Sequence, residues 1–116
     1  MGGRKILMAL NETKVFKEVI EKNGADRQLE MVIEECSELI QAICKYRRAR
    51  HNSKTSRRDL DKRIDSIIEE VADVQIMLYQ LPLMDTEWDR ESFVNEVKGT
   101  RVRKIERLQE RLNKEK

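Results

Sequence analysis

Hydrophobic residues recur along most of this chain at the spacing of an α-helix. Between residues 27 and 49, and again between residues 57 and 81, apolar residues alternate at steps of four and three, which places them in one stripe on each helix. The first stripe consists of Leu29, Ile33, Cys36, Ile40 and Ile43, and the second of Leu60, Ile64, Ile67, Val71, Val74, Leu78 and Leu81. Pro82 ends the second pattern, because proline cannot continue a helix. Two long amphipathic helices are therefore predicted.

Two further helices are predicted at residues 11–22 and 90–112, and residues 1–10 form an entry segment without a clear pattern. Asn11 is a suitable N-cap for the first of these helices, and Gly24 follows its last turn as a suitable left-handed residue. In the last helix the apolar stripe is interrupted by Arg101, where an apolar residue is expected. The members of that stripe are Val94, Val97, Ile105, Leu108 and Leu112.

The composition favours an all-α fold in a single domain spanning residues 1–116. Of the 116 residues, 40% are charged and 4% aromatic, with four glycines and one proline, a balance rich in helix formers and poor in turn and strand formers. The short polar segment 50–57, in which Ser56 and Asp59 suit a helix start, makes the two long helices an antiparallel hairpin.

Each long helix carries more apolar rows than one neighbour covers. We therefore expect the hairpin to be extended to a four-helix bundle and completed by oligomerisation, as a homodimer or a homotetramer.

The charge and hydropathy of the chain indicate which classes of partner and which cellular compartment to expect. The net charge is +2, from 24 basic and 22 acidic residues, which gives no general attraction to nucleic acid or to membranes. No stretch approaches the roughly 20 apolar residues of a membrane span, and the first residues lack the apolar core of a signal peptide. Cys36 and Cys44 suit buried thiols of a reducing compartment. We expect a cytoplasmic protein without nucleic-acid or membrane partners.

Two acidic motifs of the same form lie on the two long helices. The first is Ile-Glu-Glu-x-x-Glu, with Glu35 and Glu38, and the second is Ile-Glu-Glu-x-x-Asp, with Glu70 and Asp73. Residues three positions apart on a helix lie on the same side of it. Each motif therefore directs a pair of carboxylates to one face of its helix.

The hairpin brings the two pairs to one level. In an antiparallel hairpin, the numbers of residues that lie opposite each other add up to a constant. Glu35 and Asp73 give 108, and so do Glu38 and Glu70, which centres the hairpin on residue 54 in the predicted loop. The rows that carry these acids also carry apolar or small residues above and below, which predicts a half-buried site; these neighbours are Met31, Ala42, Ser66 and Met77.

Four carboxylates in a partly apolar setting repel one another and favour a bound divalent cation. Carboxylate oxygens without His or Cys select Mg²⁺, with Mn²⁺ as the alternative, over zinc. Because protein-bound Mg²⁺ commonly also binds substrate phosphates, the site points to phosphoryl chemistry.

Basic residues near this site are candidates for phosphate contacts. Lys45 lies two turns beyond the first acid pair, and Arg101, Lys104 and Arg107 lie on the last helix. Further basic residues crowd residues 45–58, where a solvated loop and an anion-binding surface both remain open interpretations.

The run from Gln28 to Lys45, with Glu34-Glu35-x-x-Glu38, together with Glu70-x-x-Asp73 on the third helix, resembles the MazG-like nucleotide pyrophosphohydrolases of the all-α NTP pyrophosphatase superfamily. The resemblance covers about residues 11–112. It implies a helical bundle that assembles as dimers or tetramers, with Mg²⁺ held by Glu35, Glu38, Glu70 and Asp73. It also implies catalytic roles for Glu34 and Glu38, and substrate binding by Gln28, Lys45, Arg101, Lys104 and Arg107.

The activity that the resemblance implies is hydrolysis of a nucleoside triphosphate between the α and β phosphates, giving the monophosphate and pyrophosphate. Two alternatives stay open: an enzyme similar to phosphoribosyl-ATP pyrophosphatase, and a non-catalytic helical interaction module. No residue of the sequence identifies the base or the sugar of the nucleotide.

Overall fold

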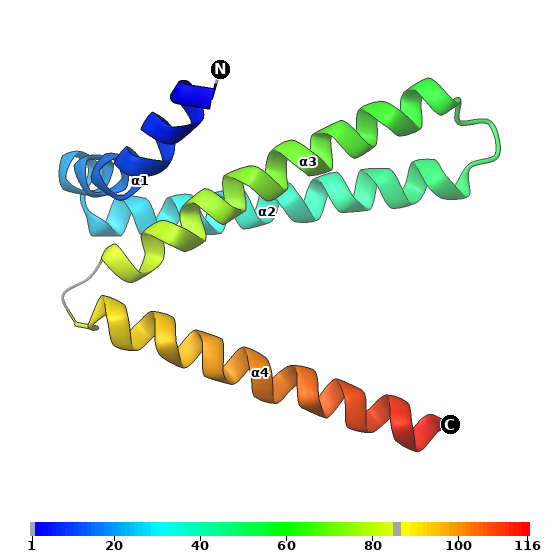
Figure 1. The fold of residues 1–116 in the computed structure, drawn as a ribbon. Coiled ribbons are helices and arrows are strands. Elements are labelled where there is room, and N and C mark those ends of the chain that lie inside the picture. The colour runs from blue at the N-terminus through cyan, green and yellow to red at the C-terminus, as the bar shows by residue number, and fades with distance from the viewer. Residues whose placement is uncertain (1, 85–86) are drawn as a thin grey trace. The chain divides into compact units, whose positions relative to one another are not determined.

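The computed structural model describes residues 2–84 and 87–116, with side chains from residue 11 onward. In this part of the chain all regular structure is helical, which confirms the predicted all-α class (Figure 1). The elements are α1 (Gly2–Asn23), α2 (Ala25–His51), α3 (Arg57–Gln80), the short 3₁₀ helix η1 (Leu81–Leu83) and α4 (Arg90–Glu115). They form two compact units, Met1–Met84 and Asp85–Lys116.

The first helix begins earlier than the sequence predicted. α1 starts at Gly2, so Asn11 lies inside the helix and the prediction that it is the N-cap is wrong. The reason is that residues 4–23 contain no glycine or proline and are rich in good helix formers. α1 ends just before Gly24, as predicted, but with φ of 87° and ψ of 151° this glycine is not in the left-handed helical conformation of the predicted cap; its amide donates to the carbonyl of Ile20 at 2.7 Å.

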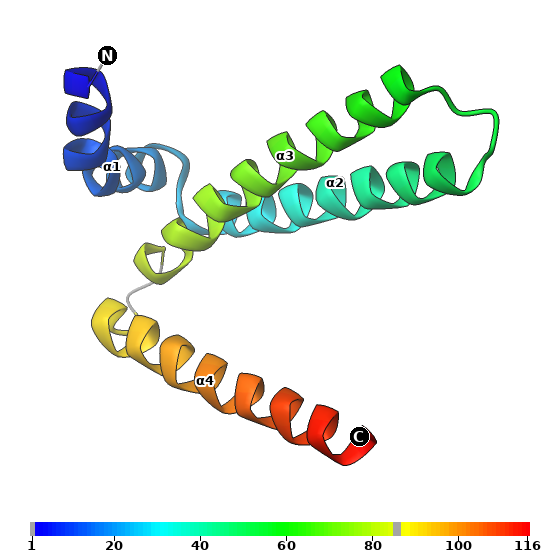
Figure 2. The same cartoon turned by 45° about the vertical axis from the view of Figure 1, so that its right-hand side comes forward.

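α2 and α3 form the predicted antiparallel hairpin, and α1 contacts both helices at the end opposite the loop (Figures 1 and 2). The Ser56 hydroxyl accepts a hydrogen bond from the amide of Asp59 at 3.1 Å, which caps the start of α3 as expected. α2 runs to His51, slightly past the predicted residue 49, and α3 ends at Gln80, where Leu81 and Pro82 begin the 3₁₀ turn.

The face that α2 turns towards α3 is not its continuous apolar stripe. Within this unit Ile33 and Ile40 of that stripe are 67% and 62% exposed, whereas Ala42 of the neighbouring row is 7% exposed. On α3 the corresponding buried residue is Met77, also in the row that carries the acids. The two acid-bearing rows therefore face each other, and we call the surface between them the seam.

The second unit consists of α4 and the residues that lead into it. The Asp89 carboxylate caps α4 by accepting a hydrogen bond from the amide of Ser92 at 3.0 Å, and the same hydrogen bond lowers the pKa of Asp89. The rings of Trp88 and Phe93 pack against each other with centroids 5.1 Å apart. α4 starts at the predicted residue and runs three residues past the predicted end at 112.

None of the described helices has the length and apolar character that a membrane span requires.

Candidate metal centre

Three of the four predicted metal ligands converge in the seam. One carboxylate oxygen from each of Glu35, Glu38 and Glu70 lies within 4.8 Å of the others. Glu35 and Glu38 come from consecutive turns of α2, and Glu70 comes from α3 on the opposite side of the seam. We call these three residues the acid cluster.

The predicted hairpin register is confirmed by a contact away from the acids. The side-chain amide of Gln28 donates to the side-chain oxygen of Gln80 at 2.8 Å, and both side chains are buried. Their residue numbers also add up to 108, like those of Glu38 and Glu70. Two independent pairs, separated along the hairpin, therefore give the same register.

Two oxygens of the acid cluster are shielded from solvent and have no hydrogen-bond partner in the part of the chain that the structure describes. They are Oε2 of Glu35 and Oε2 of Glu70. Loss of solvation raises the pKa of both carboxyls, and the negative charges of Glu38 and Asp73 raise it further. An unpartnered buried oxygen costs free energy, and a shared cation would satisfy both oxygens at once.

The donor set fits a hard divalent cation. All three clustered ligands are carboxylate oxygens, which suit Mg²⁺ or Mn²⁺, and no described His or Cys shares the group. Asp73, the fourth predicted ligand, is exposed and lies outside the group of converging oxygens. Its charge nevertheless acts on Glu35 and Glu70, since it is among the causes of their raised pKa.

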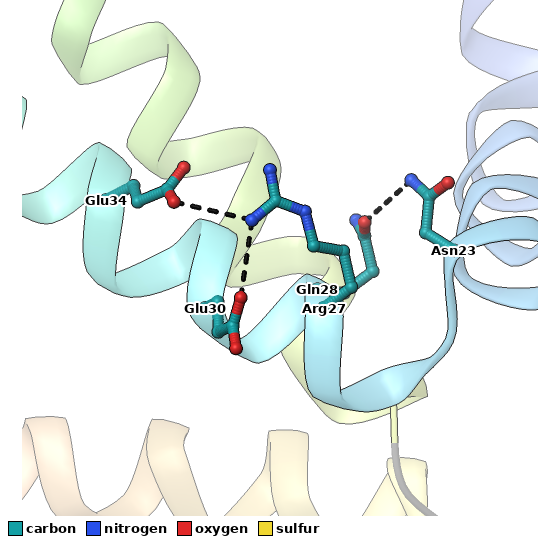
Figure 3. Close-up of polar contacts among 5 residues, drawn as sticks. All are labelled: Asn23, Arg27, Gln28, Glu30 and Glu34. Carbon is teal, nitrogen blue, oxygen red and sulfur yellow. Dashed lines mark hydrogen bonds and ion pairs between the residues drawn. The ribbon is translucent and has the colours of Figure 1, made fainter.

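Glu34, the first acid of the motif, does not join the acid cluster. It is exposed, and its Oε1 accepts a hydrogen bond from the guanidinium of Arg27 at 3.4 Å (Figure 3). The same guanidinium also bonds Glu30 at 3.3 Å. A helix rotates by about 100° per residue, so the position next to Glu35 points away from the seam. The geometry therefore gives no support to the predicted catalytic role of Glu34.

Gln28, predicted to bind substrate, has both ends of its side-chain amide occupied. Its Oε1 accepts from the Asn23 amide at 2.9 Å, as Figure 3 shows, and its Nε2 donates to Gln80. The residue is only 3% exposed. In this structure Gln28 ties the end of α1 to α2 and α3, and its predicted role in substrate binding remains untested.

A cleft of about 250 Å³ opens beside the acid cluster, on the side towards the hairpin loop. Glu38 and Glu70 of the acid cluster line one side of this cleft. Lys45 and Arg63 also line it and carry two positive charges. Gln41, Ala42 and Ser66 complete the lining. Lys45 was predicted as a substrate contact, whereas Arg63 was missed. The signal for it was available, because 45 and 63 also add up to 108.

The remaining predicted substrate contacts, Arg101, Lys104 and Arg107, are exposed residues of α4 in the second unit. Arg101 and Lys104 border a shallow hollow on α4 that is also lined by the apolar side chains of Phe93, Val97, Ile105 and Leu108. Their role in substrate binding remains a prediction. A separate hollow near the tip of the hairpin is lined by Cys44, Arg47, Arg48, His51, Asn52 and Ser53, and it includes no member of the acid cluster.

Comparison with known proteins assigns no family to this geometry. No family model matches the chain, and the searches of curated proteins and of solved structures give no match either. The acid cluster, its unpartnered oxygens and the adjoining cleft are therefore the basis for a function.

Proposed function

We propose that this protein is a Mg²⁺-dependent nucleotide pyrophosphohydrolase that cleaves a nucleoside triphosphate between its α and β phosphates. The observation that carries the proposal is the acid cluster, in which three carboxylates converge and two of them have buried oxygens without a partner. Such a site favours a cation that also binds phosphate oxygens. The resemblance of the two acidic motifs to the MazG-like enzymes supplies the nucleotide and the bond.

The residues of the cluster have distinct tasks in this reaction. Glu35, Glu38 and Glu70 would hold Mg²⁺, which when bound neutralises phosphate oxygens and acidifies a coordinated water. Asp73 adds negative charge beside them and contributes to cation affinity. Glu38 is the exposed member of the cluster and borders the cleft, so its carboxylate is the best placed to take a proton from a water.

The chemical step is an in-line displacement at the α-phosphorus. The water oxygen forms a bond to this phosphorus while the bond from the same phosphorus to the bridging oxygen breaks. Pyrophosphate leaves with the bridging oxygen and its electron pair, and Glu38 accepts the proton of the water. Glu34 has no part in this scheme, since its carboxylate is engaged by Arg27.

We also propose that the protein assembles as a homodimer or homotetramer. The support is the set of large apolar side chains that the helices of residues 2–84 leave uncovered, including Ile33, Ile40 and Ile68 at 60–67% exposure. Exposed apolar rows of this kind are typical of surfaces that pack against other helices. Light scattering after size-exclusion chromatography gives the mass of the assembly.

The test of the activity is release of pyrophosphate from each common dNTP and NTP in the presence of Mg²⁺. Wild-type protein should release pyrophosphate and the matching monophosphate, and Glu38→Gln and Asp73→Asn should lose this activity while keeping the helical fold by circular dichroism. Glu69→Gln is the matched control, because Glu69 is exposed, lies outside the acid cluster and is the weakest of the groups that raise the pKa of Glu70.

Other outcomes of the same test separate the alternatives. Release from phosphoribosyl-ATP alone would assign the chain to that reaction. No release from any of these nucleotides would contradict the enzyme proposal and leave the helical interaction module.

A further inference from the structure

The seam differs in charge on the two sides of the acid cluster. Towards the loop, Lys45 and Arg63 line the cleft that begins at Glu38 and Glu70. Away from the loop, Asp73 adds a further negative charge beside Glu70, and the rows then continue with Met31 and Met77 and with the neutral Gln28–Gln80 pair. Among the described residues of the seam, a negatively charged ligand held at the acid cluster by a cation therefore meets positive side chains only on the side towards the hairpin loop.

The two cations are available for a ligand. Among the described side chains, neither Lys45 nor Arg63 forms a hydrogen bond or an ion pair. Arg27 and Arg57, by contrast, are engaged by carboxylates of their own helices. Lys45 and Arg63 thus remain unpaired although they line the same cleft as two carboxylates of the acid cluster.

Their placement follows from the helix periodicity. On α2, Glu38, Ala42 and Lys45 are separated by steps of four and three residues. On α3, Arg63, Ser66 and Glu70 repeat these steps in the reverse direction. The small side chains of Ala42 and Ser66 lie between the acids and the cations and leave the space of the cleft open.

We propose that Lys45 and Arg63 form a phosphate subsite that binds the β and γ phosphates, so that the triphosphate chain points from the acid cluster towards the hairpin loop. This inference rests on the proposed function and assigns a direction to its substrate. Arg63 is the new binding residue, and its guanidinium offers the paired donors that phosphate oxygens accept. The nucleoside, which carries no charge, then lies on the side of Met31 and Met77.

The subsite is tested with its own ligand, inorganic pyrophosphate, on the full chain with Mg²⁺ present. Arg63→Gln should weaken binding of pyrophosphate by about tenfold, as expected for a charged hydrogen bond. It should raise the KM for the triphosphate by a similar factor. Binding of the nucleoside monophosphate product should stay close to wild type, because that product has no β or γ phosphate. Lys45→Gln should show the same pattern.

Arg58→Gln is the matched control, since it removes the same charge from an exposed position nearer the loop, outside the cleft. The subsite is contradicted if Arg63→Gln binds pyrophosphate like wild type, or if Arg58→Gln weakens it equally. It is also contradicted if Arg63→Gln weakens monophosphate binding as much as pyrophosphate binding, which would indicate a general loss of the site.

The experiment separates this inference from the proposed function. If wild-type protein releases pyrophosphate and Arg63→Gln has unchanged KM and pyrophosphate affinity, only the subsite fails. If wild-type protein releases none, the proposed function fails, and the subsite is judged by calorimetry of Mg²⁺-pyrophosphate binding to wild type and to Arg63→Gln. Circular dichroism melts show whether each variant is folded.

Discussion

Two polar layers lie in the same seam between α2 and α3, and they are satisfied in different ways. In the layer of Gln28 and Gln80 the two buried amides bond each other, and Asn23 bonds Gln28. In the acid cluster, buried oxygens of Glu35 and Glu70 have no hydrogen-bond partner among the described residues. The Gln28–Gln80 bond satisfies the glutamine layer within the described residues, whereas the acid layer leaves two buried oxygens that the proposed cation would satisfy.

The difference shows how a buried polar group indicates structure or function. A satisfied pair fixes the register of a hairpin and contributes to stability. An unsatisfied set of like charges costs stability, and either uptake of protons or a bound cation offsets this cost. Changes in the two layers should therefore affect different measurements.

The largest effect is expected for catalysis. Glu70→Gln should lower the rate of pyrophosphate release by more than about 100-fold, because loss of groups that only orient a metal ligand already costs 10–100-fold. Gln80→Met, in the other layer, should retain most of the activity of the folded protein. Steady-state assays at saturating Mg²⁺ check this, and equal losses in the two variants would break the distinction between the layers.

The next effect is on the free energy of unfolding, and it should be larger for a change in the glutamine layer than for a change in the acid cluster. Gln80→Met removes the partner of a buried amide and should lower the free energy of unfolding by about 1–3 kcal/mol. The double variant Gln28→Met/Gln80→Met, which removes both partners of the Gln28–Gln80 bond, should recover part of this loss. Urea denaturation of the four proteins of this cycle measures the coupling, and additive losses would show that the bond contributes nothing.

A smaller effect is expected in the pH dependence of the metal-free protein. The folded-state pKa values of Glu35 and Glu70 are raised above the ordinary value of 4.5, so the folded state binds protons more tightly than the unfolded state does. Their contribution to stability is present below about pH 4.5 and is lost as the pH rises through the raised values. Titration of these two groups should therefore lower the melting temperature of the protein in EDTA as the pH rises above that value, and we call this the falling component.

The matching variant sharpens this prediction. Glu35→Gln should reduce the falling component and raise the melting temperature of the metal-free protein near neutral pH by a few degrees. Glu30→Gln, at an exposed position on the same helix, should leave the component unchanged. Added Mg²⁺ should remove it in wild type, and a wild-type profile that is the same with Mg²⁺ and with EDTA would argue against cation binding.

The smallest effect is expected at Glu34. Its ion pair with Arg27 joins side chains that are 53% and 50% exposed, so Glu34→Gln should change stability by less than about 1 kcal/mol. Because Glu34 lies outside the acid cluster, pyrophosphate release should stay close to that of wild type. A loss comparable to that of Glu70→Gln would restore the catalytic role that the sequence motif suggested.

The sequence predicted the parts of the fold that depend on local periodicity. The limits of α2, α3 and α4 followed to within three residues from apolar spacing, Ser56 and Pro82, and the register followed from the two acidic motifs. The start of α1 could not be located, because residues 1–10 show no apolar stripe and only their lack of helix breakers speaks for a helix. Local pattern determines where a helix ends more clearly than where an unpatterned one begins.

The sequence was less informative about the site beyond its acids. Periodicity did not show that the continuous apolar stripe with Ile33 and Ile40 would face away from α3, since tertiary contacts decide which of two rows is covered. No pattern along its own helix marks Arg63, which lies among other charged residues there, and it becomes a candidate only when α3 is paired with α2 and it shares a cleft with Lys45. Neither effect is visible in a single helix, as both arise from pairing two helices.

The most direct test of the acid cluster is calorimetric titration of the metal-free protein with Mn²⁺ and Mg²⁺ at neutral pH. Wild type and Glu69→Gln should bind either cation, and Glu70→Gln should show at least a tenfold weaker affinity, as expected when a metal ligand is lost. Binding by wild type that Glu70→Gln retains in full, or no binding by wild type at all, would contradict the assignment of Glu35, Glu38 and Glu70 as a cation site.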